Sequence, residues 1–167
     1  RVGECRQAAQ LLDSDAAILS DVSPALFRKR RLEMPESLRR RANHYFNEAE
    51  RVAQGARAWK EGKFEQFGML MNASSDSSIE QYECGHEVII ALQQIVSATA
   101  GVYGSRFSGG GYGGCVIALA DAAQAPAAAE AIMANYRAQF PGIASKAAVY
   151  LAHSASGLQQ MGSNESR

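Results

Sequence analysis

The sequence predicts an α+β fold in which helices pack on one side of a small antiparallel sheet. Two observations lead to this prediction. Residues 4–98 carry apolar side chains at helical spacing, whereas residues 101–120 contain two short runs rich in strand-forming residues. A glycine cluster over residues 108–114 separates these runs. The 167 residues are enough for one domain with a sizeable core.

The helical part divides into five predicted segments. Proline suits the first position of a long helix that begins at Pro35, and Gly62 is a natural stop for it. Serine side chains compete for backbone hydrogen bonds, so we expect the next helix to break within residues 73–78. The other predicted helices cover residues 4–13, 25–30, 64–73 and 86–98.

The remaining part follows a strand–loop–strand–helix–strand order. The predicted strands are residues 101–107, 115–120 and 147–153, with an alanine-rich helix over residues 122–138 before the last strand. Residues 1–157 form the predicted domain, and residues 158–167 form a polar tail. Because the first residue is Arg rather than Met, we expect the natural N-terminus to lie upstream.

Charge and cysteine content exclude some classes of function. The 17 basic residues balance the 17 acidic ones, which argues against a nucleic-acid partner. The basic runs 28–31 and 39–41 contain no aromatic residues that could stack on bases, so we interpret them as solvated surface. No apolar run reaches the ~20 residues of a membrane span. Three widely spaced cysteines, Cys5, Cys84 and Cys115, indicate reduced thiols and a cytoplasmic location.

The glycine cluster is the most informative segment of the sequence. Five of the six residues 109–114 are glycine, which leaves the main chain open to close approach by a ligand. Successive N–H groups in such a loop can form a concave anion site. A plain hairpin turn needs only one or two glycines, so we favour a ligand-facing loop over a flexible connection.

Two nucleotide-binding motifs do not fit this cluster. Gly109, Gly111 and Gly114 match G-x-G-x-x-G, but a strand follows them instead of a helix. Glu130 has the spacing of the ribose-binding acid, yet it lies inside a predicted helix. The cluster is also not the phosphate-binding loop of nucleoside triphosphatases, because no Gly-Lys-Ser/Thr sequence follows it.

A few other residues admit a functional and a structural interpretation. Cys84 and His86 could begin a metal site, but no second close pair accompanies them. Arg106 could neutralise a phosphate, although we favour a structural salt bridge. For Trp59 and Cys115 we favour packing over sugar stacking and thiol reactivity, respectively.

Residues 101–119, GVYGSRFSGGGYGGCVIAL, resemble the third signature motif of the GHMP small-molecule kinases in its galactokinase form. The similarity extends over nearly the whole chain. The residues that carry it are Arg1–Cys5 with Ala8 and Ala9, Arg41–His44 with Glu48, Gly62, Phe67, Gly68, Leu70, Met71, Ser74, Ser78, Tyr82 and Glu83, Tyr150 with Leu151, and residues 155–157. Residues 77–79 and 82–85 look closer to the uronic-acid and arabinose kinases of plants and bacteria.

The resemblance implies a ferredoxin-like C-terminal domain of a sugar kinase. Family members use ATP and Mg²⁺ to phosphorylate the anomeric hydroxyl of galactose or a related sugar such as galacturonate or arabinose. By analogy, the loop supplies backbone contacts near the sugar and the transferred phosphoryl group, and a Cβ at Gly109 or Gly111 would push the loop away from the ligand or strain its dihedral angles. The implied contact residues are Ser108, Gly109, Gly110, Gly111 and Gly113.

The same resemblance implies that the chain is half of an active site. The ATP loop and the catalytic base of the family belong to an N-terminal domain that this sequence lacks. We therefore expect no catalytic base and no metal ligand here, and we expect the partners to be sugar, ATP and the N-terminal domain. The alternatives are a non-catalytic sugar sensor of galactokinase type and a small-ligand-binding module.

Overall fold

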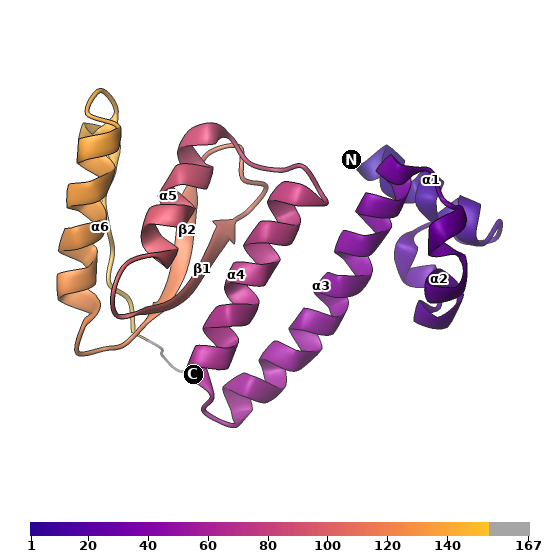
Figure 1. Ribbon diagram of the computed structural model, residues 1–167, viewed down its shortest axis with the longest axis horizontal. Helices are drawn as coiled ribbons and strands as arrows, with labels where there is room; N and C mark the ends of the chain where they lie inside the picture. Colours follow the sequence, from indigo (N-terminus) through magenta and orange to yellow (C-terminus); the bar gives the residue numbers. More distant parts are fainter. Residues whose placement is uncertain (154–167) are drawn as a thin grey trace, which may run out of the picture.

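The computed structural model describes residues 1–153 of the protein, and Figure 1 shows their arrangement. Six α-helices and one β-hairpin make up this part of the chain. The helices are α1 (Val2–Leu12), α2 (Pro24–Arg30), α3 (Glu36–Lys60), α4 (Phe64–Glu80), α5 (Glu87–Ser97) and α6 (Ala125–Gln139), and the strands are β1 (Val102–Ser108) and β2 (Cys115–Ala120). The domain limit at residue 157 and the tail 158–167 lie outside the described residues.

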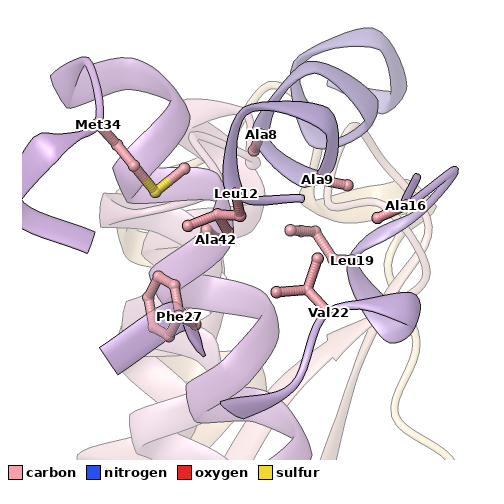
Figure 2. Close-up of a cluster of buried hydrophobic side chains, with 9 residues drawn as sticks. All are labelled: Ala8, Ala9, Leu12, Ala16, Leu19, Val22, Phe27, Met34 and Ala42. Atoms are coloured by element: carbon pink, nitrogen blue, oxygen red, sulfur yellow. The ribbon is translucent and has the colours of Figure 1, made fainter. Parts of the chain in front are cut away.

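The N-terminal helices form a separate apolar cluster around the start of α3 (Figure 2). Leu12 of α1 and Ala42 of α3 are almost fully buried within it. Phe27 of α2 stacks on Phe46 of α3 with ring centroids 4.2 Å apart. The complete set of buried members is Ala8, Ala9, Leu12, Ala16, Leu19, Val22, Phe27, Met34 and Ala42. This cluster fixes α1 against the long helix, which in turn supports the rest of the domain.

The predicted break within residues 73–78 is wrong, because α4 continues to Glu80. Two serine hydroxyls in this stretch find partners that leave the helical backbone bonds intact. Ser74 donates to the Glu48 carboxylate on α3 at 2.6 Å, and Ser78 donates to the Ser74 carbonyl at 2.9 Å. The tertiary contact with α3 therefore overrides the local preference of serine for helix ends.

The hairpin forms the sheet and lies against α4 and α5 (Figure 1). Its strands pair antiparallel, with Phe107 opposite Val116. The main chains of α4 and β1 approach so closely that a Cβ on Gly68 or Gly104 would overlap the opposing backbone. Ile117, on β2, remains 49% exposed. The predicted α+β class and the two hairpin strands are confirmed.

The predicted third strand, residues 147–153, is wrong for the described chain. The sheet within residues 1–153 has two strands, and this segment pairs with neither of them. Tyr150 is 87% exposed, so its apolar pattern does not reflect burial here. Alternating apolar residues predict extended backbone, but a strand also requires an edge to pair with. Within residues 1–153, no helix combines the length and apolar composition needed to cross a membrane.

Candidate functional site

The glycine loop connects β1 to β2 and adopts a conformation that only glycine adopts without strain. Gly109 and Gly111 have φ angles of 89° and 75°, and Gly113 and Gly114 have φ angles of 146° and 95°. Residues that carry a side chain rarely adopt φ angles in this left-handed region. Four of the five glycines are therefore required by the backbone path, as expected if the loop has a defined shape.

The outer side of this loop is open. Ser108, Gly109, Gly110 and Gly113 are exposed, and an added Cβ at Gly109 or Gly113 would meet no atom within 4 Å. Within residues 1–153, no loop or turn hydrogen bond uses the N–H groups of these three glycines or of Gly111 as donors. Main-chain donors that are free and uncovered are the groups that bind phosphate or other anions in glycine-rich loops.

The inner side of the loop is fixed by the segment that precedes α5. His86 donates its backbone N–H to the Gly111 carbonyl at 2.9 Å. A Cβ on Gly111 would come within 2.9 Å of the Phe107 ring and 3.1 Å of the Gly85 nitrogen. The sequence interpretation that a Cβ displaces the loop thus holds by contact at Gly111, whereas at Gly109 it holds by backbone conformation alone.

A buried polar network connects β1 to the helices beneath it. The Asn72 side-chain oxygen accepts hydrogen bonds from the Ser105 backbone N–H at 2.8 Å and from the Ser97 hydroxyl at 2.9 Å. The Ser97 and Ser105 hydroxyls lie 2.7 Å apart, and Gln93 donates to Ser97 at 2.9 Å. Buried groups that satisfy one another in this way fix relative positions, so β1 enters the loop from a defined place.

Glu48 of α3 bonds to two arginines and a serine close to this network. Its carboxylate accepts hydrogen bonds from Arg51 at 2.8 Å and Ser74 at 2.6 Å, and Arg106 of β1 reaches it at 3.3 Å. Burial opposes ionisation, but the bonds from Ser74 and Arg51 lower the pKa of Glu48 overall. The favoured interpretation of Arg106 as a salt-bridge residue is confirmed.

Arg41 corrects the interpretation of residues 39–41 as solvated surface. This side chain is 1% exposed and bonds three partners from two other segments. Its Nε lies 2.8 Å from Glu4, its Nη2 lies 2.6 Å from Glu83, and its Nη1 donates to the Gln81 carbonyl at 2.5 Å. A guanidinium whose three nitrogens all make hydrogen bonds joins α1, α3 and the turn after α4.

Acid should lower the stability of the fold, because it protonates the carboxylates that are bonded to Arg41. Hydrogen bonds from Arg41 and then Arg1 lower the pKa of Glu4 from 4.5 to about 2, and the Arg41 bond lowers the pKa of Glu83. The unfolded chain therefore takes up protons first, so the stabilisation is complete above pH 4.5 and is lost as pH falls toward 2.

The expected result is a thermal unfolding midpoint that falls across this window. The unfolding midpoint of Glu4→Gln should lie below that of the wild type at pH 7. The two midpoints should approach each other as the pH falls toward 2, as measured by circular dichroism. Glu33→Gln is the matched control, because Glu33 is 66% exposed and its one ion pair within residues 1–153 is with Arg30. A wild type and Glu4→Gln that stay equally far apart at every pH would contradict this account.

The other residues for which the sequence left a functional and a structural interpretation open can now be placed. Trp59 packs edge-on against Phe64 and Phe67, which confirms packing. Cys115 is exposed, so its interpretation as a core residue is wrong. Cys84 and His86 lie next to the loop, but no group of three or more metal-ligating side chains gathers among residues 1–153.

The glycine loop is open, is held by a helix-covered hairpin, and has N–H donors that no group within residues 1–153 uses. These features define a domain that can contact an anionic ligand through its main chain. The sequence profile of the family described as "GHMP kinases C terminal" matches residues 49–138, which include this loop. The chain therefore belongs to the GHMP kinases, and it carries their C-terminal domain.

Three relatives show where in this family the chain lies. It is 42% identical over 150 residues to "Galacturonokinase" of Arabidopsis thaliana, covering 86% of this chain and 35% of the relative. It is 33% identical over 154 residues to "Galactokinase" of Bos taurus, covering 92% and 37%. The crystal structure of Lactococcus lactis galactokinase complexed with galactose superposes with a TM-score of 0.74 at 30% identity, covering 83% and 37%. The chain thus spans little more than a third of the length of these relatives.

Three residues contribute more to the structure than the sequence interpretation assigned to them. The sequence interpretation places Glu83 only in the family resemblance and Arg41 there and in a basic run, whereas the structure pairs these two residues. The sequence interpretation includes Gly85 only within residues 82–85 of the family resemblance and between the possible metal ligands Cys84 and His86, yet its backbone lies close to Gly111. A glycine that directly precedes a predicted helix was the available signal for a close backbone approach.

Proposed function

We propose that this chain is the C-terminal domain of an ATP-dependent sugar 1-kinase that phosphorylates the anomeric hydroxyl of galactose or a related sugar. Galacturonate is the first substrate to test, since the similarity to a galacturonokinase extends over most of the chain. Galactose and arabinose are the other two. The observation that carries the proposal is the open glycine loop with its free main-chain donors.

The loop supplies positioning and charge stabilisation in this proposal. Phosphoryl transfer spreads negative charge over the oxygens of the transferred group, and fixed N–H donors stabilise that charge without reorganising. Ser108, Gly109, Gly110, Gly111 and Gly113 offer such donors or leave space for the ligand. Because β1 and the segment before α5 hold the loop, its donors are aimed before the ligand arrives.

The other parts of the reaction come from outside this chain. ATP supplies the phosphoryl group when it is bound. We propose that an N-terminal domain holds the ATP loop, the catalytic base and the residues for Mg²⁺, because this chain covers 35% of the length of the galacturonokinase relative. Cys5, Cys84 and Cys115 are free thiols, which supports a cytoplasmic enzyme.

The test is sugar-dependent ATP turnover by the full-length protein that contains this domain. Galacturonate, galactose and arabinose are each offered, and the 167-residue chain alone is assayed beside it. We expect turnover with one of these sugars by the full-length protein and none by the chain alone, because the site is divided between two domains. Full-length protein that binds a sugar without turnover would contradict the kinase and favour a sugar sensor. Turnover or tight sugar binding by the chain alone would contradict the divided site.

A further inference from the structure

Glu83 has an unusual backbone conformation two residues before Gly85. Its φ angle is 54°, and it is the one non-glycine residue among those described with a positive φ. A glutamate in the left-handed region is held there against its own preference. Observed strain of this kind needs surrounding contacts to maintain it, and it often lies next to functional groups.

Three arginines maintain the conformation of Glu83. Arg1 and Arg41 contact its Oε2 at 2.8 and 2.6 Å, and Arg40 contacts its Oε1 at 2.9 Å. Arg1 also donates to the Glu83 carbonyl at 3.3 Å. Figure 1 shows the N-terminus beside the turn that follows α4, where these contacts form. Both carboxylate oxygens and the backbone of Glu83 are thus fixed from α3 and from the residue that precedes α1.

The fixed residue leads directly to the inner side of the glycine loop. Gly85 would meet a Cβ of Gly111 at 3.1 Å, and His86 donates to the Gly111 carbonyl at 2.9 Å. The backbone between Glu83 and His86 has little freedom, because the Cys84 N–H is bonded to the Ser78 carbonyl at 2.9 Å. A change of backbone angle at Glu83 would therefore move the surface on which Gly111 rests.

We propose that Glu83 is a positioning residue, which through its arginine contacts sets the place of the glycine loop relative to the reacting groups. This inference rests on the proposed kinase function for its catalytic part. Its structural part, the coupling of Glu83 to the loop, stands independently. The two parts are separated by measuring both amide exchange and turnover.

The experiment compares Glu83→Ala, Glu83→Gly and Glu61→Ala in the full-length protein. Alanine removes the carboxylate and resists the left-handed conformation, whereas glycine removes the carboxylate and permits it. Glu61→Ala is the matched control, because it also removes an ion-paired carboxylate, that of the Lys63 pair beyond the end of α3. Hydrogen exchange is followed over residues 84–87 and 108–114, with α6 as reference, because α6 supplies none of the contacts of Glu83.

Glu83→Ala should speed exchange in these two segments by about tenfold or more, the factor that corresponds to the strain of one non-glycine residue. It should also lower kcat by about 10- to 100-fold with a smaller change in KM, because the loop acts on the transition state. Glu83→Gly should recover part of both losses, and Glu61→Ala should change neither.

Several results would overturn the proposal. Exchange in the loop that stays at the wild-type rate in Glu83→Ala would remove the coupling. Faster exchange in α6 to the same extent would mean general destabilisation instead of positioning. Altered loop exchange with unchanged kcat would remove the catalytic part. Wild-type protein inactive on all three sugars would contradict the proposed kinase, while the selective exchange in Glu83→Ala would still support the coupling.

Discussion

Gly104→Ala is expected to lower the free energy of unfolding by about 3 kcal/mol or more, because it forces two backbones apart. A Cβ on Gly104 would overlap the Gly68 carbonyl of α4. Neither partner is a flexible side chain, so the clash is relieved only by separating β1 from the helix. That separation would also break the Asn72 hydrogen bond to the Ser105 N–H. Chemical denaturation of the purified chain measures the loss.

Gly3→Ala is the control for this prediction. It makes the same substitution in α1, where an added Cβ meets nothing within 4 Å. Alanine is the better helix former, so this variant should equal or exceed the wild type by up to about 1 kcal/mol. Equal stability of Gly104→Ala and the wild type would show that α4 and β1 do not lie in contact. Failure of Gly104→Ala to fold while Gly3→Ala folds would support the close approach.

The parts of the fold that the sequence could predict depend on local chemistry. The long helix α3 was placed within a residue or two at each end, because Pro35 and Gly62 punctuate a continuous apolar stripe. Strand β2 was placed without error for the same reason, since a glycine cluster precedes its apolar run. In both cases neighbouring residues in the chain determine the outcome.

The errors concern elements that depend on distant partners. The serines of α4 looked like a helix break, and only the approach of Glu48 from α3 explains why they are helical. Residues 147–153 had the pattern of a strand, but the described chain gives them no strand to pair with. Local preference is a small free energy, and one tertiary hydrogen bond is of comparable size.

One part of the candidate site could likewise be predicted from the sequence, and another part could not. The open side of the loop was predictable, because glycine composition itself determines which backbone angles are free. Its support was not, because Glu83 acts through contacts with Arg1 and α3, and Gly85 through its approach to the loop. Arg41 shows the difference most clearly: within a run of three arginines, only the fold makes one of them almost completely buried.

Gly111→Ala is expected to lower turnover of the full-length protein about 100-fold, the loss typical of an angstrom-scale displacement of catalytic groups. Gly111 has a φ of 75°, and a Cβ there would come within 2.9 Å of Phe107. The loop must therefore move outward, toward the space in which the ligand would lie. Because the donors would be misplaced in the transition state, kcat should fall more than KM rises. Steady-state kinetics with the preferred sugar and ATP measure both.

Two further variants separate displacement of the loop from simple obstruction. Gly110 has no positive φ, and a Cβ there would approach only Tyr112, at 3.6 Å. Gly110→Val should therefore also lower turnover, by filling the ligand side, while the His86 N–H stays protected from exchange. Gly111→Ala should lose that protection, because its carbonyl is the acceptor. Gly142→Ala, in the open turn after α6, should leave both unchanged. Turnover of Gly111→Ala within about twofold of the Gly142→Ala value would mean that the loop lies away from the chemistry, since displacement of a contacting loop costs far more.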